Sequence, residues 1–274
     1  MNSRKITGLT LIICVLTLTG FAATWACAAE PADSNAAATP ASPAGKRVKF
    51  VLMGDSTVSD RQGWGPGFKQ FLNNNAFCVN TAIGGRSSKS FINEGRLKKA
   101  IALKGDYYLI QFGHNDEPNK GEERTTDPNT TYREYMTQYI NEVRAIGAKP
   151  ILVTPMVRRQ WDKSDPNTIN STLAPYAEAV RQLAKEKNVP LVDLYTSSKK
   201  LCEQLGKQKC YEFSPIKDSN QFDNTHLNDK GSVMFARLVV EDLVKAVPEL
   251  KPCFRSEPAA DANTPAKASP GLAQ

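Results

Sequence analysis

The sequence predicts an α/β layered fold built on a parallel β-sheet. Short apolar runs alternate along the chain with longer segments of helical spacing, which is the order of elements typical of this class. The first and third runs stop abruptly at Gly54 and Gly113, as buried strands do. Unusual polar residues follow three of the runs, and in such sheets ligands bind beyond the carboxyl ends of the strands.

The first half of the chain supplies three expected strands and two expected helices. The strands are expected at 48–53, 77–81 and 107–112. The helices are expected at 67–73 and 97–103. Each strand is a short apolar run, whereas the second helix shows apolar residues at helical spacing. Asparagines end the first helix, and a glycine-rich loop over 84–87 follows the second strand.

The second half continues the alternation. Helices are expected at 132–146, 173–186 and 228–247, and strands at 150–154 and 189–194. The first of these helices has the clearest period, with apolar or aromatic residues at 132, 135, 136, 139, 140, 143 and 146. Two long polar loops are expected at about 117–130 and 158–170.

Residues 1–29 have the composition of a secretory signal peptide. Arg4 and Lys5 give it a positive start, and an apolar stretch then runs from Ile6 to Ala26, followed by small residues. The stretch is also long enough for a retained membrane anchor, and Cys27 would permit anchoring as a lipoprotein. We expect cleavage, and hence a secreted or periplasmic protein that is not held stably at a membrane.

One folded domain is expected between two polar segments. Residues 30–46 are rich in Ala, Pro, Ser, Asp and Asn without apolar periodicity, which predicts a disordered linker. Residues 256–274 have the same character and are an expected disordered tail. The part between them, 47–255, contains about 210 residues, enough for a complete core.

Charge narrows the classes of partner only slightly. Loss of Arg4 and Lys5 with the signal would lower the formal net charge from +7 to +5. A mild positive charge fits an acidic polymer such as a polyuronide, but it equally fits an ordinary soluble protein. No long Lys/Arg run or aromatic-basic interleaving is present, so nucleic-acid binding has no support. We expect a monomer that needs no cofactor.

The cysteines indicate disulfides rather than a metal site. Cleavage after Cys27 would leave four of the six cysteines, and export would permit disulfides. Cys202 and Cys210 enclose a short polar stretch and are the first expected pair. Cys78 and Cys253 are then the remaining pair. None of the four has metal-ligand spacing, so we expect no zinc site.

A serine, a histidine and an aspartate have the spacing of a nucleophile and its base. Ser56 follows the first strand, and a serine hydroxyl needs a base to become nucleophilic. The chain has two histidines, and His226 lies three residues after Asp223, which can orient its ring. The alternative is that Asp223 caps the last helix and that Ser56 caps a helix after the strand.

Three groups could stabilise the oxyanion of acyl transfer. These are the N–H groups of Ser56 and Gly85 and the side-chain amide of Asn115. Ordinary turns are the alternative for Gly85 and Asn115. The other histidine, His114, could be a second base, a metal ligand or a structural residue beneath the site. The scattered acidic residues make no recognisable metal pattern.

Four sequence blocks together resemble the SGNH, or GDSL-type, hydrolases. The blocks are Gly54-Asp55-Ser56, Gly85, Gly113-His114-Asn115-Asp116 and Asp223-Asn224-Thr225-His226. The resemblance implies a flavodoxin-like three-layer α/β/α sandwich with a five-stranded parallel sheet. It implies Ser56 as nucleophile, His226 as base and Asp223 as its partner. It also implies an oxyanion hole made by Ser56, Gly85 and Asn115.

Within that superfamily the sequence of the motifs is similar to that of the rhamnogalacturonan acetylesterase branch. The wider similarity extends over 80–91, 111–116, Thr154-Pro155, Arg158-Arg159 and Asp223 to Leu227. Lys89 and Met156-Val157 depart from the branch, which usually has Arg at the first position. The resemblance implies a secreted carbohydrate esterase that removes O-acetyl groups from pectic rhamnogalacturonan.

Substrate contacts are expected from basic residues near the mouth of the site. The candidates are Arg86, Lys89, His114, Arg158 and Arg159, although the charged ones could also be ordinary surface residues. An acetylated xylan, a lipid or a thioester are alternative substrates, but the polar loops disfavour an acyl groove. A carbohydrate-binding module without activity is the alternative from another class.

Overall fold

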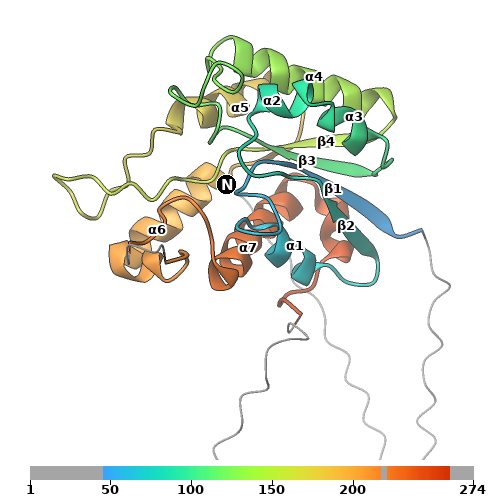
Figure 1. The fold of residues 1–274 in the computed structure, drawn as a ribbon. Coiled ribbons are helices and arrows are strands. Elements are labelled where there is room, and N and C mark those ends of the chain that lie inside the picture. Colours follow the sequence, from blue (N-terminus) through green and yellow to red (C-terminus); the bar gives the residue numbers. More distant parts are fainter. Residues whose placement is uncertain (1–45, 217–220, 260–274) are drawn as a thin grey trace, which may run out of the picture. The chain divides into compact units, whose positions relative to one another are not determined.

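The computed structural model describes residues 46–216 and 221–259, which form a five-stranded parallel sheet between two layers of helices (Figure 1). The strands are β1 (Val48–Gly54), β2 (Ala76–Asn80), β3 (Tyr107–Gln111), β4 (Lys149–Val153) and β5 (Leu191–Val192). The helices are α1 (Gly65–Phe71), α2 (Ser88–Asn93), α3 (Arg96–Ile101), α4 (Thr131–Ala145), α5 (Ala174–Lys187), α6 (Leu194–Tyr211) and α7 (Asp229–Ala246), with a 3₁₀ helix η1 (Pro248–Cys253). The predicted α/β class is confirmed.

The order of strands across the sheet is β2-β1-β3-β4-β5, and all neighbours are parallel. The chain therefore moves outward in one direction from β1 to β2 and in the other from β3 onward. Ligands bind in open α/β sheets where the strand order reverses in this way. The reversal lies between β1 and β3, and these two strands lead into the loops that carry Ser56 and Asn115.

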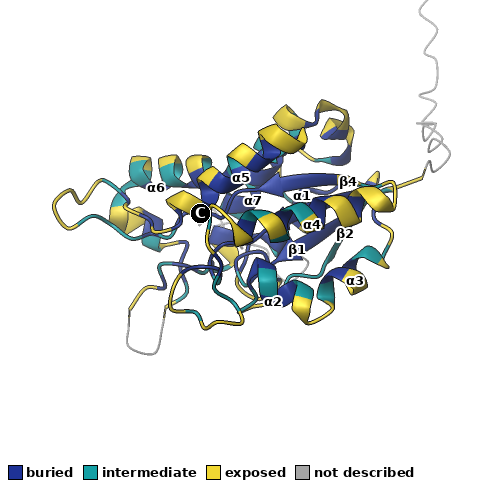
Figure 2. Ribbon diagram, turned by 90° about the horizontal axis from the view of Figure 1, so that it is seen from above, coloured by how far each residue is buried: buried dark blue, intermediate teal, exposed yellow. Residues whose placement is uncertain are grey.

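The two helical layers bury opposite faces of the sheet. In Figure 1, α2, α3, α4 and α5 lie on one face, and α1, α6 and α7 lie on the other. Figure 2 shows buried residues along the strands and on the inward sides of the helices, with exposed residues on their outward sides. This distribution follows from the helical period of the apolar residues in α4, α5 and α7.

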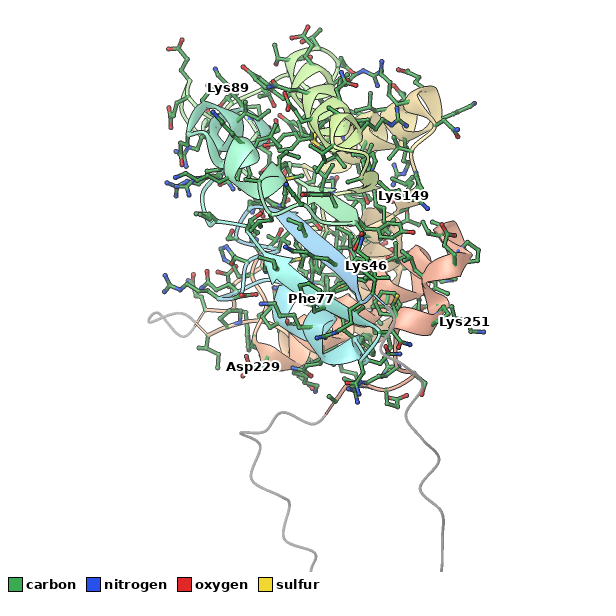
Figure 3. The ribbon with its side chains drawn as sticks, turned by 90° about the vertical axis from the view of Figure 1, so that its right-hand side faces the viewer. Lys46, Phe77, Lys89, Lys149, Asp229 and Lys251 are labelled. Atoms are coloured by element: carbon green, nitrogen blue, oxygen red, sulfur yellow. The ribbon has the colours of Figure 1, made fainter. Side chains whose placement is uncertain are left out.

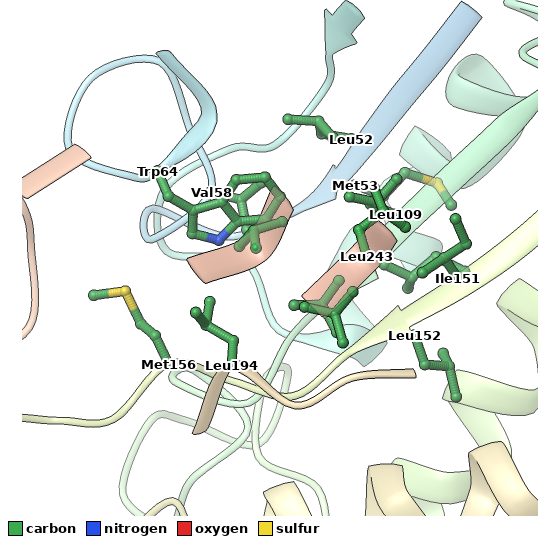
Figure 4. Close-up of a cluster of buried hydrophobic side chains, with 14 of the residues drawn as sticks. Leu52, Met53, Val58, Trp64, Leu109, Ile151, Leu152, Met156, Leu194 and Leu243 are labelled. Atoms are coloured by element: carbon green, nitrogen blue, oxygen red, sulfur yellow. The ribbon is translucent and has the colours of Figure 1, made fainter. Parts of the chain in front are cut away.

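The hydrophobic core continues beneath the loop that follows β1. Val58 and Trp64 belong to this loop, are fully buried and lie beside each other in Figure 4. The Trp64 ring also meets the Phe68 ring of α1 edge to face, with 5.8 Å between the centroids. The loop therefore rests on a packed aromatic base, which restricts movement of Ser56 above it.

Several elements differ from the sequence prediction. The expected strand over 189–194 is reduced to two residues, because α6 begins already at Leu194. The long α6 and the short α2 were not predicted. The described fold also extends past the predicted end at residue 255. There the Arg255 N–H donates to Phe71 O, and the Ala259 N–H donates to Gln70 O.

The predicted disulfides are not formed, since all four cysteines in the described ranges are free thiols. The spacing argument did identify neighbours, because the Cys202 and Cys210 thiols share a hydrogen bond. The expected bridge between Cys78 and Cys253 is likewise absent. Cys78 lies on β2, and burial raises its pKa to about 12, so this thiol stays protonated at neutral pH.

The expected signal peptide and nearly all of the expected linker lie outside the described residues. So does most of the expected C-terminal tail. Within the described ranges, no helix is both long enough and apolar enough to span a membrane.

Candidate active site

The loop after β1 presents Ser56 in a fixed geometry. Asp55 Oδ1 accepts hydrogen bonds from the Thr57 N–H at 2.8 Å and from the Thr57 hydroxyl at 2.7 Å. Gln111, the last residue of β3, donates to Thr57 Oγ1 at 2.7 Å and accepts from Trp64 Nε1 at 2.9 Å. This buried network fixes the residues on both sides of Ser56, whose own side chain stays partly exposed.

The structure brings Ser56, His226 and Asp223 into one chain of hydrogen bonds. Ser56 Oγ lies 2.9 Å from His226 Nε2, although the two residues are 170 positions apart in sequence. His226 Nδ1 lies 2.9 Å from Asp223 Oδ2. Nucleophile, base and orienting carboxylate thus have the distances that proton transfer requires.

The protonation state of Asp223 determines the direction of these hydrogen bonds. Burial raises the pKa of Asp223, but hydrogen bonds from the His226 side chain and from the backbone of His226 and Thr225 outweigh it and hold the pKa well below its usual value. Asp223 is therefore ionised at neutral pH and can only accept a hydrogen bond. His226 must then carry a proton on Nδ1, which leaves the Nε2 lone pair to accept the Ser56 hydroxyl proton.

The turn that carries Asp223 and His226 is closed by its own carboxylate. Asp223 Oδ1 accepts from the Thr225 N–H at 2.7 Å and from the His226 N–H at 3.0 Å. Immediately afterwards Asn228 caps α7, because its side-chain oxygen accepts from the Gly231 N–H at 2.9 Å. The Asp-x-x-His spacing is therefore both a stable turn and a means of orienting the imidazole. The alternative that Asp223 caps the last helix is wrong, because Asn228 is the cap of α7.

The glycine loop that contains Gly85, a predicted oxyanion donor, lies next to Ser56. A Cβ atom built on Gly84 would lie 3.5 Å from Ser56 Cβ, so the glycine loop approaches the nucleophile directly. Gly85 has a φ of +79°, a conformation that favours glycine. Within the described ranges, the N–H groups of Ser56 and Gly85 donate to no protein acceptor. Both remain available for a substrate oxygen.

The side-chain amide of Asn115 uses one N–H in a hydrogen bond within the protein, and its second N–H can bind another acceptor. Its Nδ2 donates to the Arg86 carbonyl oxygen at 3.1 Å, which ties the loop after β3 to the glycine loop after β2. An amide nitrogen has two protons, so the second can serve an oxyanion. Like Ser56 and Gly85, Asn115 is partly exposed, whereas its neighbours His114 and Asp116 are buried.

Asp116 anchors the same loop to the start of α2. Its carboxylate accepts from the Ser88 N–H at 3.1 Å and from the Thr126 hydroxyl at 3.0 Å. Burial raises the pKa of Asp116 to about 7 against these hydrogen bonds. The Tyr176 hydroxyl donates to the Asp116 carbonyl oxygen at 2.9 Å. Asn115 is thus the solvent-facing residue of a segment whose other contacts are internal.

His114 lies beneath the site and not at its mouth. It is 2% exposed, and its Nδ1 lies 3.7 Å from Asp55 Oδ2. Burial lowers the pKa of His114 well below its usual value, so the ring is neutral. Direct contact with a substrate, one of the roles considered from the sequence, does not fit this position. The ring packs below the nucleophile loop, as in the structural alternative.

The basic candidates occupy different environments. Arg86 and Lys89 are partly exposed on the segment that follows Gly84. Arg86 pairs with Glu94 at 3.1 Å, and Lys89 Nζ donates to the Glu122 carbonyl oxygen at 2.7 Å. Figure 3 shows Lys89 directed outward from α2.

Arg158 and Arg159 are turned into the protein. Arg158 pairs with Glu117 at 2.6 Å, and both side chains are largely buried. Arg159 is 1% exposed. Neither guanidinium is placed like a surface cation, so the expectation that these two residues contact the substrate has no support in their positions.

Some residues that shape the site were missed by reasoning from sequence. Thr57, Gln111, Glu117 and Thr225 all make side-chain hydrogen bonds that hold the loops around Ser56, His226 and Asn115. Each lies within two residues of a recognised block or inside one. Proximity to a block was therefore the available signal, but it does not show which side chain faces inward.

A separate hollow lies at the opposite edge of the sheet. It has a volume of about 800 Å³, and its lining includes Lys46, Arg47 and Lys149. Figure 3 shows Lys46 and Lys149 at this edge. The lining contains no serine, cysteine or histidine, so it offers no nucleophile with a base. Within the described ranges, no cluster of His, Cys, Asp and Glu is arranged to hold a metal ion.

The arrangement can carry out acyl transfer. The Ser56 hydroxyl lies 2.9 Å from the His226 imidazole, and Asp223 holds the ring. Asn115 is bonded to the glycine loop that approaches Ser56. These are the parts needed to form a tetrahedral intermediate on an ester carbonyl and to stabilise its oxyanion.

Known proteins with similar sequences include esterases. The model of the GDSL-like lipase/acylhydrolase family matches residues 52–233. The rhamnogalacturonan acetylesterase RhgT of Bacillus subtilis (strain 168) is 38% identical over 216 residues, which cover 72% of this chain and 90% of that protein. A rhamnogalacturonan acetylesterase of Emericella nidulans is 30% identical over 222 residues, covering 72% and 84%.

Solved structures share the architecture. The crystal structure of YxiM from Bacillus subtilis superposes with a TM-score of 0.62 at 29% identity. The superposed part covers 73% of this chain and 57% of YxiM. The acetylxylan esterase Axe2 from Geobacillus stearothermophilus gives a TM-score of 0.55 at 20% identity, covering 73% of this chain and 95% of that one. The second likeness concerns the fold alone.

Proposed function

The chain belongs to the GDSL-like lipase/acylhydrolase family and is an esterase, and from this premise we propose that it removes O-acetyl groups from pectic rhamnogalacturonan. The observation that carries the mechanism is the chain of two 2.9 Å hydrogen bonds from Ser56 through His226 to Asp223. The relatives named as rhamnogalacturonan acetylesterases support the choice of substrate.

In the first half-reaction Ser56 Oγ attacks the acetyl carbonyl carbon. His226 Nε2 takes the hydroxyl proton, and the ionised Asp223 stabilises the imidazolium that results. The carbonyl oxygen becomes an oxyanion, which accepts hydrogen bonds from the N–H groups of Ser56 and Gly85 and from Asn115 Nδ2. Collapse of the intermediate expels the sugar oxygen, which takes the proton from His226, and leaves Ser56 acetylated.

The second half-reaction repeats these steps with water. His226, neutral again, takes a proton from a water molecule that attacks the acetyl group on Ser56. The same three donors hold the second oxyanion. Its collapse releases acetic acid, which ionises to acetate, and returns the proton to Ser56. Both half-reactions use only water and the side-chain and backbone groups named above.

An acidic sugar next to the acetylated one would meet basic residues. Arg86 and Lys89 are the candidates whose positions permit this, because both are partly exposed on the segment that begins at the glycine loop. Arg158 is largely buried in its ion pair with Glu117 and is not available, whereas Arg86 remains partly exposed in its pair with Glu94. The chemistry of the mouth therefore supports a uronic-acid-containing polymer over a neutral one.

The test is acetate release by wild type and by Ser56→Ala from acetylated rhamnogalacturonan, acetylated xylan and long-chain 4-nitrophenyl esters. We expect the wild type to release acetate fastest from rhamnogalacturonan and Ser56→Ala to be inactive on every substrate. Equal rates in the two proteins would reject the serine mechanism. Faster release from xylan or from the long-chain esters would reject the proposed substrate and leave the mechanism intact.

We also propose that the protein is exported and acts as a monomer. Export is supported by the signal-like composition of residues 1–29, and a plant cell-wall polymer is met outside the cell. Fractionation of cells that express the full chain, compared with a chain that lacks residues 1–29, tests export. Retention of both chains in the cytoplasm would contradict it. Light scattering of the purified protein tests the monomer.

A further inference from the structure

Arg159 holds the turn that carries Asp223 and His226 from behind. Its Nη2 donates to the carbonyl oxygens of Asp223 at 2.8 Å and His226 at 2.6 Å, and to the Ser214 hydroxyl at 3.0 Å. Its backbone N–H donates to the Asn224 carbonyl oxygen at 2.8 Å. One buried cation therefore fixes both ends of the turn and the segment that leads into it.

The environment of Arg159 does not favour a role in stability. Within the described ranges its guanidinium makes no salt bridge, and its Nε and Nη1 atoms have no hydrogen-bond partner. The ring of Phe235 lies 5.9 Å from the guanidinium carbon. Burying a cation without a paired carboxylate is unfavourable, and an apolar side chain of similar size would often be more stable. The contacts with the turn are the interactions that offset this disadvantage.

Arg158 connects the other half of the site to the same turn. Its Nη2 donates to the His114 carbonyl oxygen at 3.0 Å, and its Nη1 donates to the Thr225 hydroxyl at 2.6 Å. Glu117 accepts from Nε at 3.0 Å and from Nη2 at 2.6 Å, which holds the guanidinium plane. Since His114 and Glu117 flank Asn115 closely in sequence, Arg158 links the loop of the oxyanion donor to the turn of the base.

We propose that Arg158 and Arg159 are positioning residues that hold the base turn and the oxyanion loop in register with Ser56. The segment after β4 carries both side chains, so a single stretch of backbone holds the loop after β3 and the turn after α6 at a fixed distance from each other. The proposal rests on the proposed function, because it assigns the two arginines a part in that reaction without contact with the substrate.

The first test is Arg159→Met, assayed with 4-nitrophenyl acetate. A displaced imidazole slows proton transfer but leaves substrate binding intact, so we expect kcat to fall on the order of 10²-fold and KM to change by less than about threefold. The Nδ1–H proton resonance of His226 should shift or broaden. Labelling of Ser56 by a fluorophosphonate should slow in parallel with kcat.

Three further variants separate positioning from general destabilisation. Thr225→Val removes the Arg158 contact with the turn and keeps the side-chain volume, and it should lower kcat with little change in melting temperature. Arg159→Lys keeps a buried cation that is too short for the same contacts, and it serves if Arg159→Met does not fold. The matched control is Arg181→Met, which breaks a half-buried ion pair with Asp193 that includes neither the base turn nor Asn115.

The proposal is overturned if the Arg159 variants that fold keep kcat within about threefold of wild type, or if Arg181→Met lowers kcat as much as they do. It is also overturned if the loss appears in KM alone. Ser56→Ala distinguishes this failure from that of the proposed function. An inactive Ser56→Ala beside fully active Arg159 variants rejects only the positioning role, whereas an active Ser56→Ala rejects the serine mechanism itself.

Discussion

At the scale of single residues, the surroundings of two carboxylates in the site shift their pKa values in opposite directions. Hydrogen bonds hold the pKa of Asp223 well below its usual value although burial raises it, so this group is charged when it meets His226. Burial raises the pKa of Asp55, which lies next to the nucleophile and has one oxygen without a hydrogen-bond partner in the described ranges. Hydrogen bonds thus favour the charged form of Asp223, where it orients the base, whereas burial opposes the charged form of Asp55.

Asp223→Asn tests that assignment. The amide keeps the shape of the side chain but can donate to Nδ1, which favours the imidazole tautomer that cannot accept the Ser56 proton. We expect kcat to fall by about 10³- to 10⁴-fold, as in other serine–histidine–aspartate sites. Asp229→Asn is the control, because Asp229 is an exposed carboxylate three residues after His226 (Figure 3). A similar loss in both variants would contradict the account.

Reasoning from sequence identified the residues of the hydrogen-bonded chain but not the environment of every candidate. A strand that ends at Gly113 predicts a loop at the correct edge of the sheet, and Asn115 does face that edge. The sequence does not show that His114 turns inward while Asn115 turns outward, because a loop has no fixed side-chain period. The two arginines after β4 were likewise expected at the surface and are buried.

At the scale of elements, α7 fixes the base as much as the turn before it does. Asn228 caps this helix two residues after His226 and also donates to the Glu212 and Ser214 carbonyl oxygens, at 2.8 and 3.1 Å. The cap therefore ties the start of α7 to the segment that follows α6. Helix α2 has a corresponding role for the glycine loop, because Asp116 accepts from its first N–H group.

Asn228→Ala should destabilise the protein by about 1 kcal/mol, the usual effect of losing an N-cap side chain. Because the helix begins so close to His226, we also expect a moderate fall in kcat. Urea denaturation followed by circular dichroism measures the first effect. Asn74→Ala, which removes an exposed amide between α1 and β2, is the control and should leave both quantities unchanged. An unaltered free energy of unfolding in Asn228→Ala would show that the cap is dispensable.

The stability that Asp116 contributes, where it joins the loop after β3 to the start of α2, depends on pH. Its folded-state pKa of about 7 lies above the ordinary value of 3.8, so the folded protein binds this proton more tightly than the unfolded chain. The contribution to stability is therefore fully present below about pH 4 and declines as the pH rises towards 7. Asp116→Asn cannot ionise. In thermal melts at a series of pH values, the melting temperature of the variant relative to that of wild type should increase from about pH 4 to pH 7. A difference in melting temperature that stays constant over this interval would contradict the assignment.

The prediction of elements succeeded where apolar residues follow a regular period. Helices α4, α5 and α7 were expected within one or two residues of their observed ends. Helix α6 was missed because it is rich in lysine and glutamine and is interrupted at Gly206, where φ is +78°. Its first residues also continue the apolar run of β5, so the run was assigned wholly to a strand. Tertiary packing, which sequence periodicity does not report, decides that boundary.

At the scale of the whole molecule, the reversal of strand order explains why distant blocks meet. β1 and β3 are neighbours in the sheet, and the loops that follow them carry Ser56 and Asn115. The strand order could not be read from the sequence, because alternating strands and helices are compatible with several orders. The convergence of polar residues at one edge could be predicted, since all carboxyl ends of a parallel sheet lie on the same side.

The account depends on Ser56 and His226 acting as one unit. Reaction with a fluorophosphonate, followed by peptide mapping and mass spectrometry, tests this most directly. We predict a single phosphonylated residue, Ser56, and labelling at least about 10²-fold slower in His226→Ala, because the hydroxyl is a weak nucleophile without its base. Labelling of a different residue, or an equal rate in the wild type and the variant, would contradict the account.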